Sequence, residues 1–318
     1  MKNYRCLILF PIDEEDKKRL EEKFPNLEIT YSQPDEVSIR EIGNADIVIG
    51  NPKVAQLKYA AKLQWLQLRS AGADEYASCP YLGEKVLLTN GRGAYGSRLA
   101  EYMLGGILAL QKHFPAYWEH QKRREWKKEG LVRQIAGSVV LVLGVGDIGG
   151  TFAKYCKAMG AYVIGLRRQE GRPCDTVDEI YGIGSLDKLL PRADIVAMCL
   201  PNTPQTAGVI GERQLAFMKE GAILVNVGRG IAVDTPSLCA ALERGKLYGA
   251  VLDVTEEEPL PADHPLWQYD NVILTPHIAG TFDQKEGFHN FYLIAEENIS
   301  RFFEGKTLRN LVDRELLY

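Results

Sequence analysis

The sequence lacks a long apolar run, a strong charge bias and any paired cysteine motif. No apolar stretch approaches the ~20 residues of a membrane-spanning helix, so we expect no membrane association. The 38 basic and 42 acidic side chains leave a net charge of -4, which does not fit a protein that binds nucleic acid through a broad basic surface. The apolar start, Cys6–Phe10, is short, is followed by Pro11 and has no small-residue cleavage site. It therefore predicts a strand and not a signal peptide.

Cysteine and histidine occur without the spacing that metal sites need. The six cysteines are scattered and form no Cys-x-x-Cys pair, so they predict reduced, mostly buried thiols in a cytoplasmic protein. A disulfide framework or a zinc site is not expected. The histidines at His113, His120, His264 and His289 also lack ligand spacing. We expect no metal site.

The chain is long enough for two domains, because 318 residues exceed what one hydrophobic core usually holds. In the first hundred residues, short strand-like runs alternate with helical segments, which is the pattern of a doubly wound parallel sheet. An amphipathic helix over 13–24 begins at Asp13, which is suited to cap it. The predicted strands are Cys6–Phe10, Leu27–Tyr31, Asp46–Gly50, Trp65–Arg69 and Val86–Asn90.

A second alternating unit follows a long predicted helix, Ser97–Gln111. Gly105 and Gly106 in its middle cost about 1 kcal/mol each relative to alanine, so we expect close packing there. The lysine- and arginine-rich segment 118–129 predicts a solvated helix face, with a phosphate-binding patch as the alternative. A last helix over 284–305 should return to the first domain. The predicted six strands of the second sheet are Val139–Leu143, Ala161–Leu166, Ile195–Leu200, Ala222–Val227, Gly249–Val254 and Val272–Leu274.

The most specific motif is a glycine turn between the strand Val139–Leu143 and the helical segment that follows. Gly144 permits the tight turn, Gly146 lets backbone approach a pyrophosphate, and Gly149 lets the helix pack closely on the strand. The helix start, with Asp147 and Ile148, offers free N–H groups to phosphates. Strand, turn and helix in this order predict a dinucleotide-binding site and not an ordinary turn.

The residues after the second strand of this unit indicate which dinucleotide is bound. An acidic residue about 20 positions after the turn usually binds the ribose hydroxyls of NAD. Here that position holds Arg167, with Arg168 beside it, and the acids Glu170 and Asp175 come later. A guanidinium pairs with a 2′-phosphate, so the sequence predicts NADP. The alternative is that both arginines face solvent and the cofactor is NAD.

Three further segments follow predicted strands and carry an arginine, acids and a histidine. They are Asn226-Val-Gly-Arg-Gly230, Leu252-Asp-Val-Thr-Glu-Glu-Glu-Pro-Leu260 and Leu274-Thr-Pro-His-Ile-Ala-Gly280. Open parallel sheets bind ligands at the carboxyl ends of their strands. We therefore expect these side chains to converge on one site.

With these motifs in combination, the whole chain resembles the D-isomer-specific 2-hydroxyacid dehydrogenases, which include glyoxylate/hydroxypyruvate reductases. The resemblance implies that Arg229, Glu258 and His277 are the catalytic triad, with Glu256 and Glu257 as solvated loop acids. Arg229 would bind the substrate carboxylate and polarise the carbonyl. His277 would donate the proton while Glu258 orients and stabilises the protonated ring.

The resemblance also implies further binding residues. The backbone of Ala71, Gly72 and Ala73 would hold the substrate carboxylate, although this segment also reads as a plain turn. The roles of Arg92, Tyr95 and Trp126 stay open between pocket and packing, and His289 is a minor candidate for the pocket wall. The remaining implied cofactor contacts are Pro201, Val227, Asp253, His277, Ala279 and Gly280.

Together these features predict an α/β protein of two doubly wound parallel-sheet domains. Residues 1–98 with 288–318 would form a flavodoxin-like substrate domain, and residues 99–287 a Rossmann dinucleotide-binding domain. The implied activity is the reversible, NAD(P)H-dependent reduction of a small 2-keto acid to a D-2-hydroxy acid by a homodimer. The rival hypothesis is a corepressor-like protein that uses the same fold to sense NAD(H).

Overall fold

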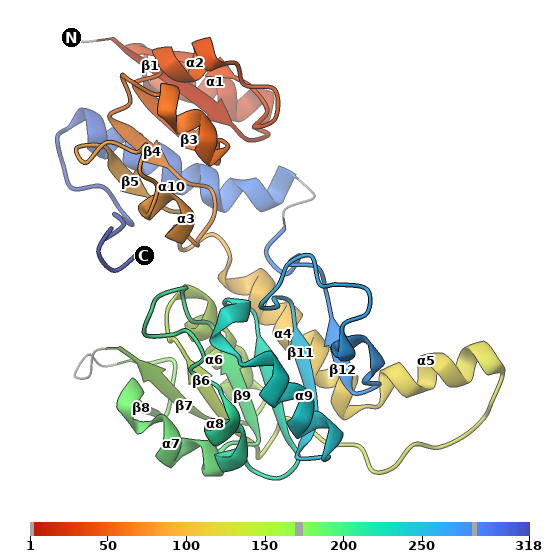
Figure 1. The fold of residues 1–318 in the computed structure, drawn as a ribbon. Helices are drawn as coiled ribbons and strands as arrows, with labels where there is room; N and C mark the ends of the chain where they lie inside the picture. The colour runs from red at the N-terminus through yellow and green to blue at the C-terminus, as the bar shows by residue number, and fades with distance from the viewer. Residues whose placement is uncertain (1–2, 169–173, 282–284) are drawn as a thin grey trace. The chain divides into compact units, whose positions relative to one another are not determined.

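The computed structural model describes residues 3–168, 174–281 and 285–318 (Figure 1). The chain forms two compact units, the first from Met1–Tyr95 with Phe282–Tyr318 and the second from Gly96–Thr281. The sequence had placed these boundaries at residues 98 and 288. Among the described residues, no helix is long and apolar enough to cross a membrane.

The first unit is a five-stranded parallel sheet with the order β2-β1-β3-β4-β5. This is the flavodoxin-like order, as the sequence predicted. Asp13 caps α1 by accepting a hydrogen bond from the Asp16 N–H at 2.8 Å, which was also predicted. The elements are β1 (Tyr4–Leu9), α1 (Glu14–Lys23), β2 (Leu27–Tyr31), α2 (Ile39–Asn44), β3 (Ile47–Gly50), β4 (Trp65–Gln67), α3 (Asp74–Ala77), β5 (Leu87–Thr89) and α10 (Lys285–Phe303).

The C-terminal helix α10 belongs to this first unit and is tied to its sheet by buried polar groups. The Trp65 Nε1 donates to Thr89 Oγ1, which donates in turn to Gln67 Oε1. The Asn298 amide of α10 donates to that same Gln67 oxygen at 2.8 Å. Because these groups are buried, each must find a protein partner. The C-terminal helix α10 thus completes the core of the unit that the N-terminal residues form.

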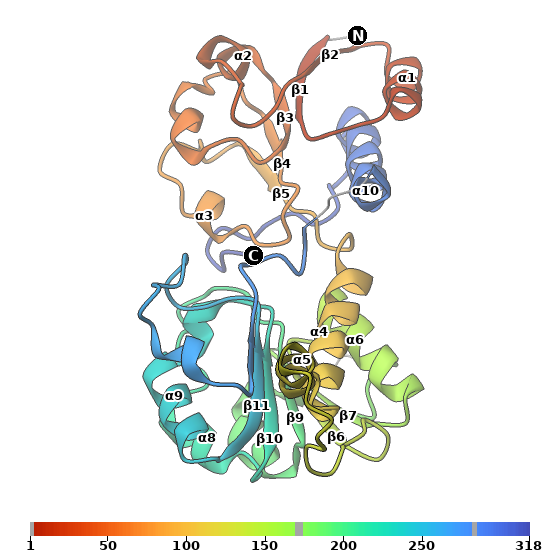
Figure 2. The ribbon, with the colours of Figure 1, turned by 90° about the vertical axis from the view of Figure 1, so that its right-hand side faces the viewer.

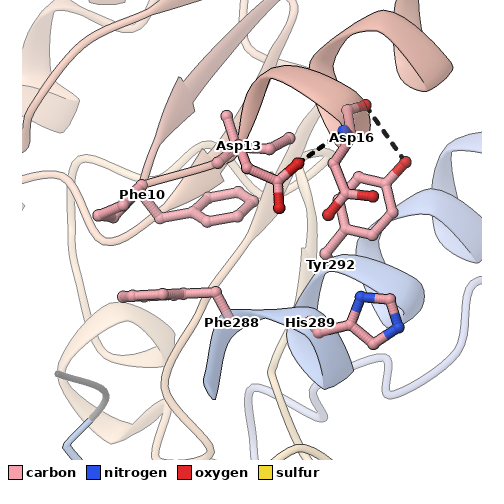
Figure 3. A pocket seen from close by; sticks show the side chains of 8 residues that line it. Phe10, Asp13, Asp16, Phe288, His289 and Tyr292 are labelled. Carbon is pink, nitrogen blue, oxygen red and sulfur yellow. Dashed lines mark hydrogen bonds between the residues drawn. The ribbon is translucent and has the colours of Figure 1, made fainter. Parts of the chain in front are cut away.

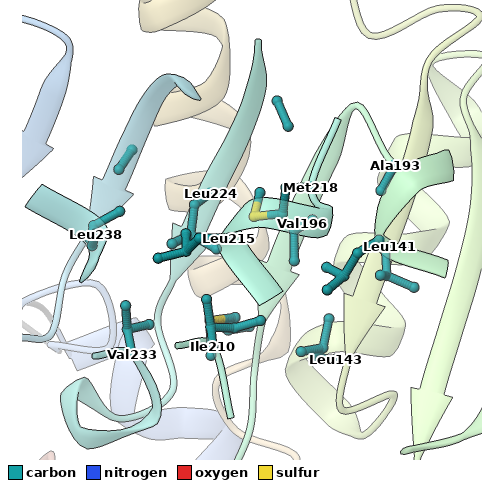
Figure 4. Close-up of a cluster of buried hydrophobic side chains, with 14 of the residues drawn as sticks. Leu141, Leu143, Ala193, Val196, Ile210, Leu215, Met218, Leu224, Val233 and Leu238 are labelled. Atoms are coloured by element: carbon teal, nitrogen blue, oxygen red, sulfur yellow. The ribbon is translucent and has the colours of Figure 1, made fainter. Parts of the chain in front are cut away.

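The second unit contains a seven-stranded parallel sheet with the order β12-β11-β10-β9-β6-β7-β8. Its apolar core fills one face of this sheet (Figure 4). The elements are α4 (Gly96–Gln111), α5 (Phe114–Arg123), β6 (Val139–Leu143), α6 (Asp147–Ala158), β7 (Tyr162–Arg167), β8 (Glu179–Gly182), α7 (Leu186–Leu189), β9 (Ile195–Met198), α8 (Glu212–Phe217), β10 (Ala222–Asn226), α9 (Thr235–Glu243), β11 (Leu247–Leu252) and β12 (Val272–Leu274).

Two predictions about this unit were wrong in detail. The sheet has a seventh strand, β8, which the sequence analysis missed because its four residues at the sheet edge are only partly buried and carry no alternating apolar pattern. The basic segment is not a helix over 118–129. α5 spans Phe114–Arg123, and the next residue, Arg124, has a left-handed φ of 58° that ends the helix.

Beyond α5, a histidine holds the following segment. The buried His120 ring faces Glu125 through Nδ1 at 2.9 Å and Glu129 through Nε2 at 2.6 Å. The basic residues around it, Lys122, Arg123 and Lys127, are exposed, as expected of a solvated surface.

The close packing expected at the middle of α4 is present at one of its two glycines. A Cβ on Gly106 would lie 2.5 Å from Val251 Cγ1 of β11, whereas a Cβ on Gly105 would meet no heavy atom within 4 Å. Gly106 therefore lets α4 approach the sheet, and Gly105 serves no such contact.

This difference gives a matched pair of substitutions. Gly105→Ala should raise the free energy of unfolding by up to about 1 kcal/mol, because alanine favours the helix. Gly106→Ala should lower it by about 1–3 kcal/mol, because the new methyl overpacks against Val251. Thermal and denaturant unfolding of both variants would measure this, and equal effects at the two positions would contradict the assigned contact.

Candidate active site

The glycine turn of the second unit has the geometry that a dinucleotide needs. Gly144 has a φ of 94°, and a Cβ on Gly149 would lie 2.1 Å from the Gly144 oxygen, so neither position accepts a side chain. Gly146 is exposed, and a Cβ there would meet nothing within 4 Å among the described residues. Gly146, the N-cap of α6, brings no side chain to the helix start. The turn is thus an open cradle before a helix N-terminus, which suits a pyrophosphate.

The turn lies against the loops that follow β9 and β10. A Cβ on Gly144 would contact the Cys199 oxygen at 2.6 Å, and one on Gly228 would contact the Leu200 oxygen at 2.6 Å. These contacts place Pro201, three residues after β9, and Val227, directly after β10, at the carboxyl ends of these neighbouring strands. Val227 is buried, and Pro201 is half-buried.

Arg229 follows β10 in a tightly bonded turn. The Asn226 side chain donates to the Arg229 oxygen at 2.9 Å and accepts from the Gly228 N–H at 3.0 Å. The Arg229 Nη1 donates to the Gly228 oxygen, and the side chain is half-buried. A Cβ on Gly230 would lie 1.8 Å from the Thr255 oxygen. The arginine turn therefore rests directly on the loop after β11.

That loop carries Glu258, which contacts His277. The Glu258 Oε2 lies 2.8 Å from His277 Nδ1, and its Oε1 accepts from the Thr255 N–H at 3.1 Å. Nδ1 must carry the proton in a hydrogen bond to a carboxylate. The other ring nitrogen, Nε2, makes no hydrogen bond to any described residue. The pair is part-exposed, with 52% of the His277 side chain accessible, so Nε2 can face a substrate.

A buried carboxylate, Asp253, fixes the loop that carries His277. Its Oδ1 accepts from the Thr275 hydroxyl at 2.6 Å and from the Ile278 N–H at 2.8 Å, and its Oδ2 accepts from the Ala279 N–H at 3.0 Å. The Asp253 oxygen also accepts from the His277 N–H. His277 itself has a left-handed φ of 54°, a conformation that persists only where surrounding bonds impose it.

The structure thus gathers the loops of three predicted triad residues at one edge. β10, β11 and β12 are neighbours in the sheet, and each bears one of Arg229, Glu258 and His277 beyond its carboxyl end.

Arg167 is the last residue of β7 and is half-buried. Its Nε is buried and has no hydrogen-bond partner among the described residues. Arg168 is exposed, and Glu170 lies outside the described residues.

In the first unit, the predicted substrate loop follows β4. Asn51 accepts hydrogen bonds from the Arg69 and Ser70 N–H groups, and the Asn90 amide donates to the Ala71 oxygen at 2.9 Å. The N–H groups of Ala71, Gly72 and Ala73 donate no hydrogen bond to any described residue. Three free donors in a braced loop suit a carboxylate. Sequence reasoning missed Asn51 and Asn90, although each directly follows a strand.

A small pocket of about 50 Å³ lies at the carboxyl end of β1 in the first unit (Figure 3). The rings of Phe10 and Phe288 face each other there with centroids 6.1 Å apart. His289 lines this pocket, and its role in the wall of the substrate pocket stays a prediction. The other lining residues are Pro11, Ile12, Asp13, Asp16 and Tyr292.

Among the described residues, no group of three His, Cys, Asp or Glu could hold a metal ion.

The seven-stranded sheet and its open glycine cradle define a Rossmann-type dinucleotide-binding unit. Residues 104–279 match the family model described as D-isomer specific 2-hydroxyacid dehydrogenase, NAD binding domain. The chain belongs to this family of NAD(P)-dependent dehydrogenases, as the sequence motifs predicted.

Similar proteins support this assignment. A solved family member from Aeromonas salmonicida is 34% identical, with a TM-score of 0.86 over 98% of this chain and 100% of that one. An NADPH-dependent glyoxylate/hydroxypyruvate reductase from Sinorhizobium meliloti, solved with NADP and sulfate, is 27% identical, with a TM-score of 0.83 over 99% and 100%. A glyoxylate reductase from Aeropyrum pernix is 36% identical over 73% of this chain and 71% of its own length.

The bonds of Asp253 lead to a prediction about the histidine loop. Asp253→Asn keeps the shape but loses one acceptor, which leaves a buried donor unsatisfied at a cost of about 1–3 kcal/mol. We expect a lower melting temperature and faster hydrogen exchange at the Ile278 and Ala279 amides. Asp263→Asn, at an exposed loop position, is the control. Unchanged exchange in Asp253→Asn would show that the carboxylate does not hold the loop.

Proposed function

We propose that this protein reduces a small 2-keto acid to a D-2-hydroxy acid with NADPH, and that Arg229, Glu258 and His277 carry out the reaction. The observation that carries the proposal is the 2.8 Å contact between His277 and Glu258 on a loop fixed by Asp253. The relatives named as glyoxylate reductases act on keto acids of this kind.

The residues at the turn fit a dinucleotide, because Gly144 and Gly149 leave room for backbone at a helix start whose N-cap, Gly146, has no side chain. Gly146, Asp147 and Ile148 would face the pyrophosphate. Pro201, Val227, Asp253, Ala279 and Gly280 remain proposed contacts along the same edge. The bound cofactor supplies the hydride that reaches the carbonyl carbon of the substrate.

His277 gives the matching proton to the carbonyl oxygen. The Nδ1–H is held by Glu258, so a protonated ring presents its Nε2–H outward, and loss of that proton leaves a neutral ring still bonded to the carboxylate. Arg229 binds the substrate carboxylate and polarises the carbonyl with the positive charge of its planar guanidinium. The free N–H groups of Ala71, Gly72 and Ala73 provide the further carboxylate contacts.

The activity is tested with glyoxylate, hydroxypyruvate and phenylpyruvate and both reduced cofactors. His277→Gln should lower kcat by about 10²- to 10⁴-fold, the usual contribution of a general acid. Glu258→Gln should also lower it, because the protonated ring loses its anionic partner. Glu256→Gln, at an exposed acid of the same loop, should leave kcat unchanged.

Two results would contradict this proposal. An equal loss of activity in Glu256→Gln and Glu258→Gln would remove the special role of the carboxylate. NADPH binding without turnover of any keto acid would support the rival function, a sensor of the cofactor.

NADP is proposed over NAD because Arg167 and Arg168 occupy the position where an acid would bind the ribose of NAD. The buried Nε of Arg167, which has no hydrogen-bond partner among the described residues, supports this. So do the NADPH-dependent relative from Sinorhizobium meliloti and its bound NADP.

Replacing both arginines tests the cofactor preference. Arg167→Gln with Arg168→Gln should lower kcat/KM for NADPH by about 10- to 100-fold, because hydrogen bonds to a charged phosphate are lost. The value for NADH should change little. Steady-state kinetics with both cofactors measures this. A higher kcat/KM for NADH than for NADPH in the unaltered protein would refute the preference.

A homodimer in the cytoplasm is also proposed. α5 and the segment after it expose large apolar side chains, which in proteins commonly mark an association surface. Trp126 is fully exposed, and Trp118 is 52% exposed. A role for Trp126 at such a surface accounts for its exposure better than a role in packing within its own unit. The other exposed apolar side chains there are Phe114, Leu131 and Val132.

A further inference from the structure

Arg69, which directly precedes the proposed substrate loop, has a firmly held backbone. Its N–H donates to Asn51 Oδ1 at 2.8 Å, and its oxygen accepts from the Tyr95 hydroxyl at 2.8 Å. A Cβ on Gly91 would lie only 2.0 Å from that same oxygen, so the chain at Gly91 presses directly on it. These contacts fix the position of the Arg69 backbone, and so of the Cα that bears the side chain, next to the loop.

The guanidinium of Arg69 has no anionic partner among the described residues. It lies over the ring of Phe288, with Cζ 5.6 Å from the centroid. It makes no ion pair and donates no hydrogen bond to any described residue, although the side chain is half-buried. A partly buried charge is normally paired, because burial weakens its hydration. An aromatic face compensates only in part.

The same guanidinium is close to two hydroxyls around the loop. Burial raises the pKa of Tyr95 to about 12, and the positive charge of Arg69 opposes that rise. It likewise opposes the rise in the pKa of Tyr76 that burial causes. Tyr76 donates to the Pro52 oxygen after β3, and Tyr95 donates to Arg69 itself. Each hydroxyl thus donates its hydrogen to a backbone oxygen, and the Arg69 side chain donates no hydrogen bond to either hydroxyl.

Arg69 is also close to the free N–H groups. It precedes Ala71 by two residues, so their Cα atoms lie within about 7 Å. The N–H groups of Ala71, Gly72 and Ala73 would hold the carboxylate next to the keto group. A second anionic group, one or two carbons further along the substrate, would then come within reach of Arg69.

We propose that Arg69 is a specificity-determining residue that binds a second anionic group, a carboxylate or a phosphate, on the 2-keto acid. The planar guanidinium can bind either group through two parallel hydrogen bonds while Phe288 supports its face. The inference rests on the proposed keto-acid reduction and extends it to the substrate class.

The test compares substrates with one and two anionic groups. The probes are glyoxylate, oxaloacetate, 2-oxoglutarate and phosphohydroxypyruvate, assayed by NADPH oxidation. Arg69→Met keeps an apolar chain over Phe288 but removes the charge. It should lower kcat/KM for the doubly anionic substrate that the enzyme prefers by about 10- to 100-fold. The value for glyoxylate should stay within about twofold. The preferred substrate distinguishes a carboxylate from a phosphate.

Two further variants control this experiment. Arg69→Lys keeps the charge without the two parallel donors and should restore part of the loss. Lys58→Met removes a charge that also lies over an aromatic ring, that of Tyr59, 4.8 Å away in the same unit, and should have no effect. Melting temperature and NADPH binding should be unchanged in all three variants.

The outcomes separate this inference from the proposed function. Reduction of glyoxylate without reduction of any doubly anionic substrate would overturn the role of Arg69 and leave keto-acid reduction in place. An equal loss for all substrates in Arg69→Met would also overturn it, because Arg69 would then bind the common carboxylate. Failure to reduce any keto acid would refute both.

Discussion

The candidate active site depends on one buried carboxylate, Asp253, and on what its two oxygens accept. A hydroxyl and two N–H groups from the loop after β12 converge on it. These bonds impose a left-handed conformation on His277, which a non-glycine residue rarely adopts alone. They also set the ring beside Glu258. Asp253 thereby fixes the position of the His277 ring through hydrogen bonds to the loop that carries it.

The loops around Asp253 are joined by backbone contacts as well as by side chains. The Asp253 N–H donates to the Asn226 oxygen, and Gly230 lies directly against Thr255. The arginine, the carboxylate and the imidazole are therefore mounted on a single connected edge of three neighbouring strands. Such an arrangement favours catalysis, because it leaves little reorganisation for the moment of reaction.

Much of this fold was predictable, because its strands are buried apolar runs separated by clear turns. Leu27–Tyr31, Val139–Leu143 and Val272–Leu274 were placed to the residue. β8 was missed because its stability comes from pairing with β7 and not from its own four residues. The end of α5 was misplaced because a left-handed Arg124 leaves no sequence signal. The local sequence pattern did not predict β8 or the end of α5, because contacts with other parts of the fold determine them.

In the candidate active site, too, some residues could be predicted from the local sequence and others could not. The spacing of the motifs located Arg229, Glu258 and His277, because these residues lie in the loops after three neighbouring parallel strands. The hydrogen bonds by which Asn51 and Asn90 hold the loop after β4 join residues about 20 positions apart. No short motif encodes such contacts. The carboxylate of Asp253 was predicted as a cofactor contact, and its bonds to the histidine loop appeared only in three dimensions.

The buried bonds between Asn298 and Gln67 carry a consequence for how the protein is made. A ribosome releases the second unit, Gly96–Thr281, as one continuous stretch that can fold as soon as it emerges. The first unit is complete only when α10, synthesised some two hundred residues after β5, has emerged. The strands made first are consequently the last to be completed, and until then the side chains that pack against α10 lack their partner.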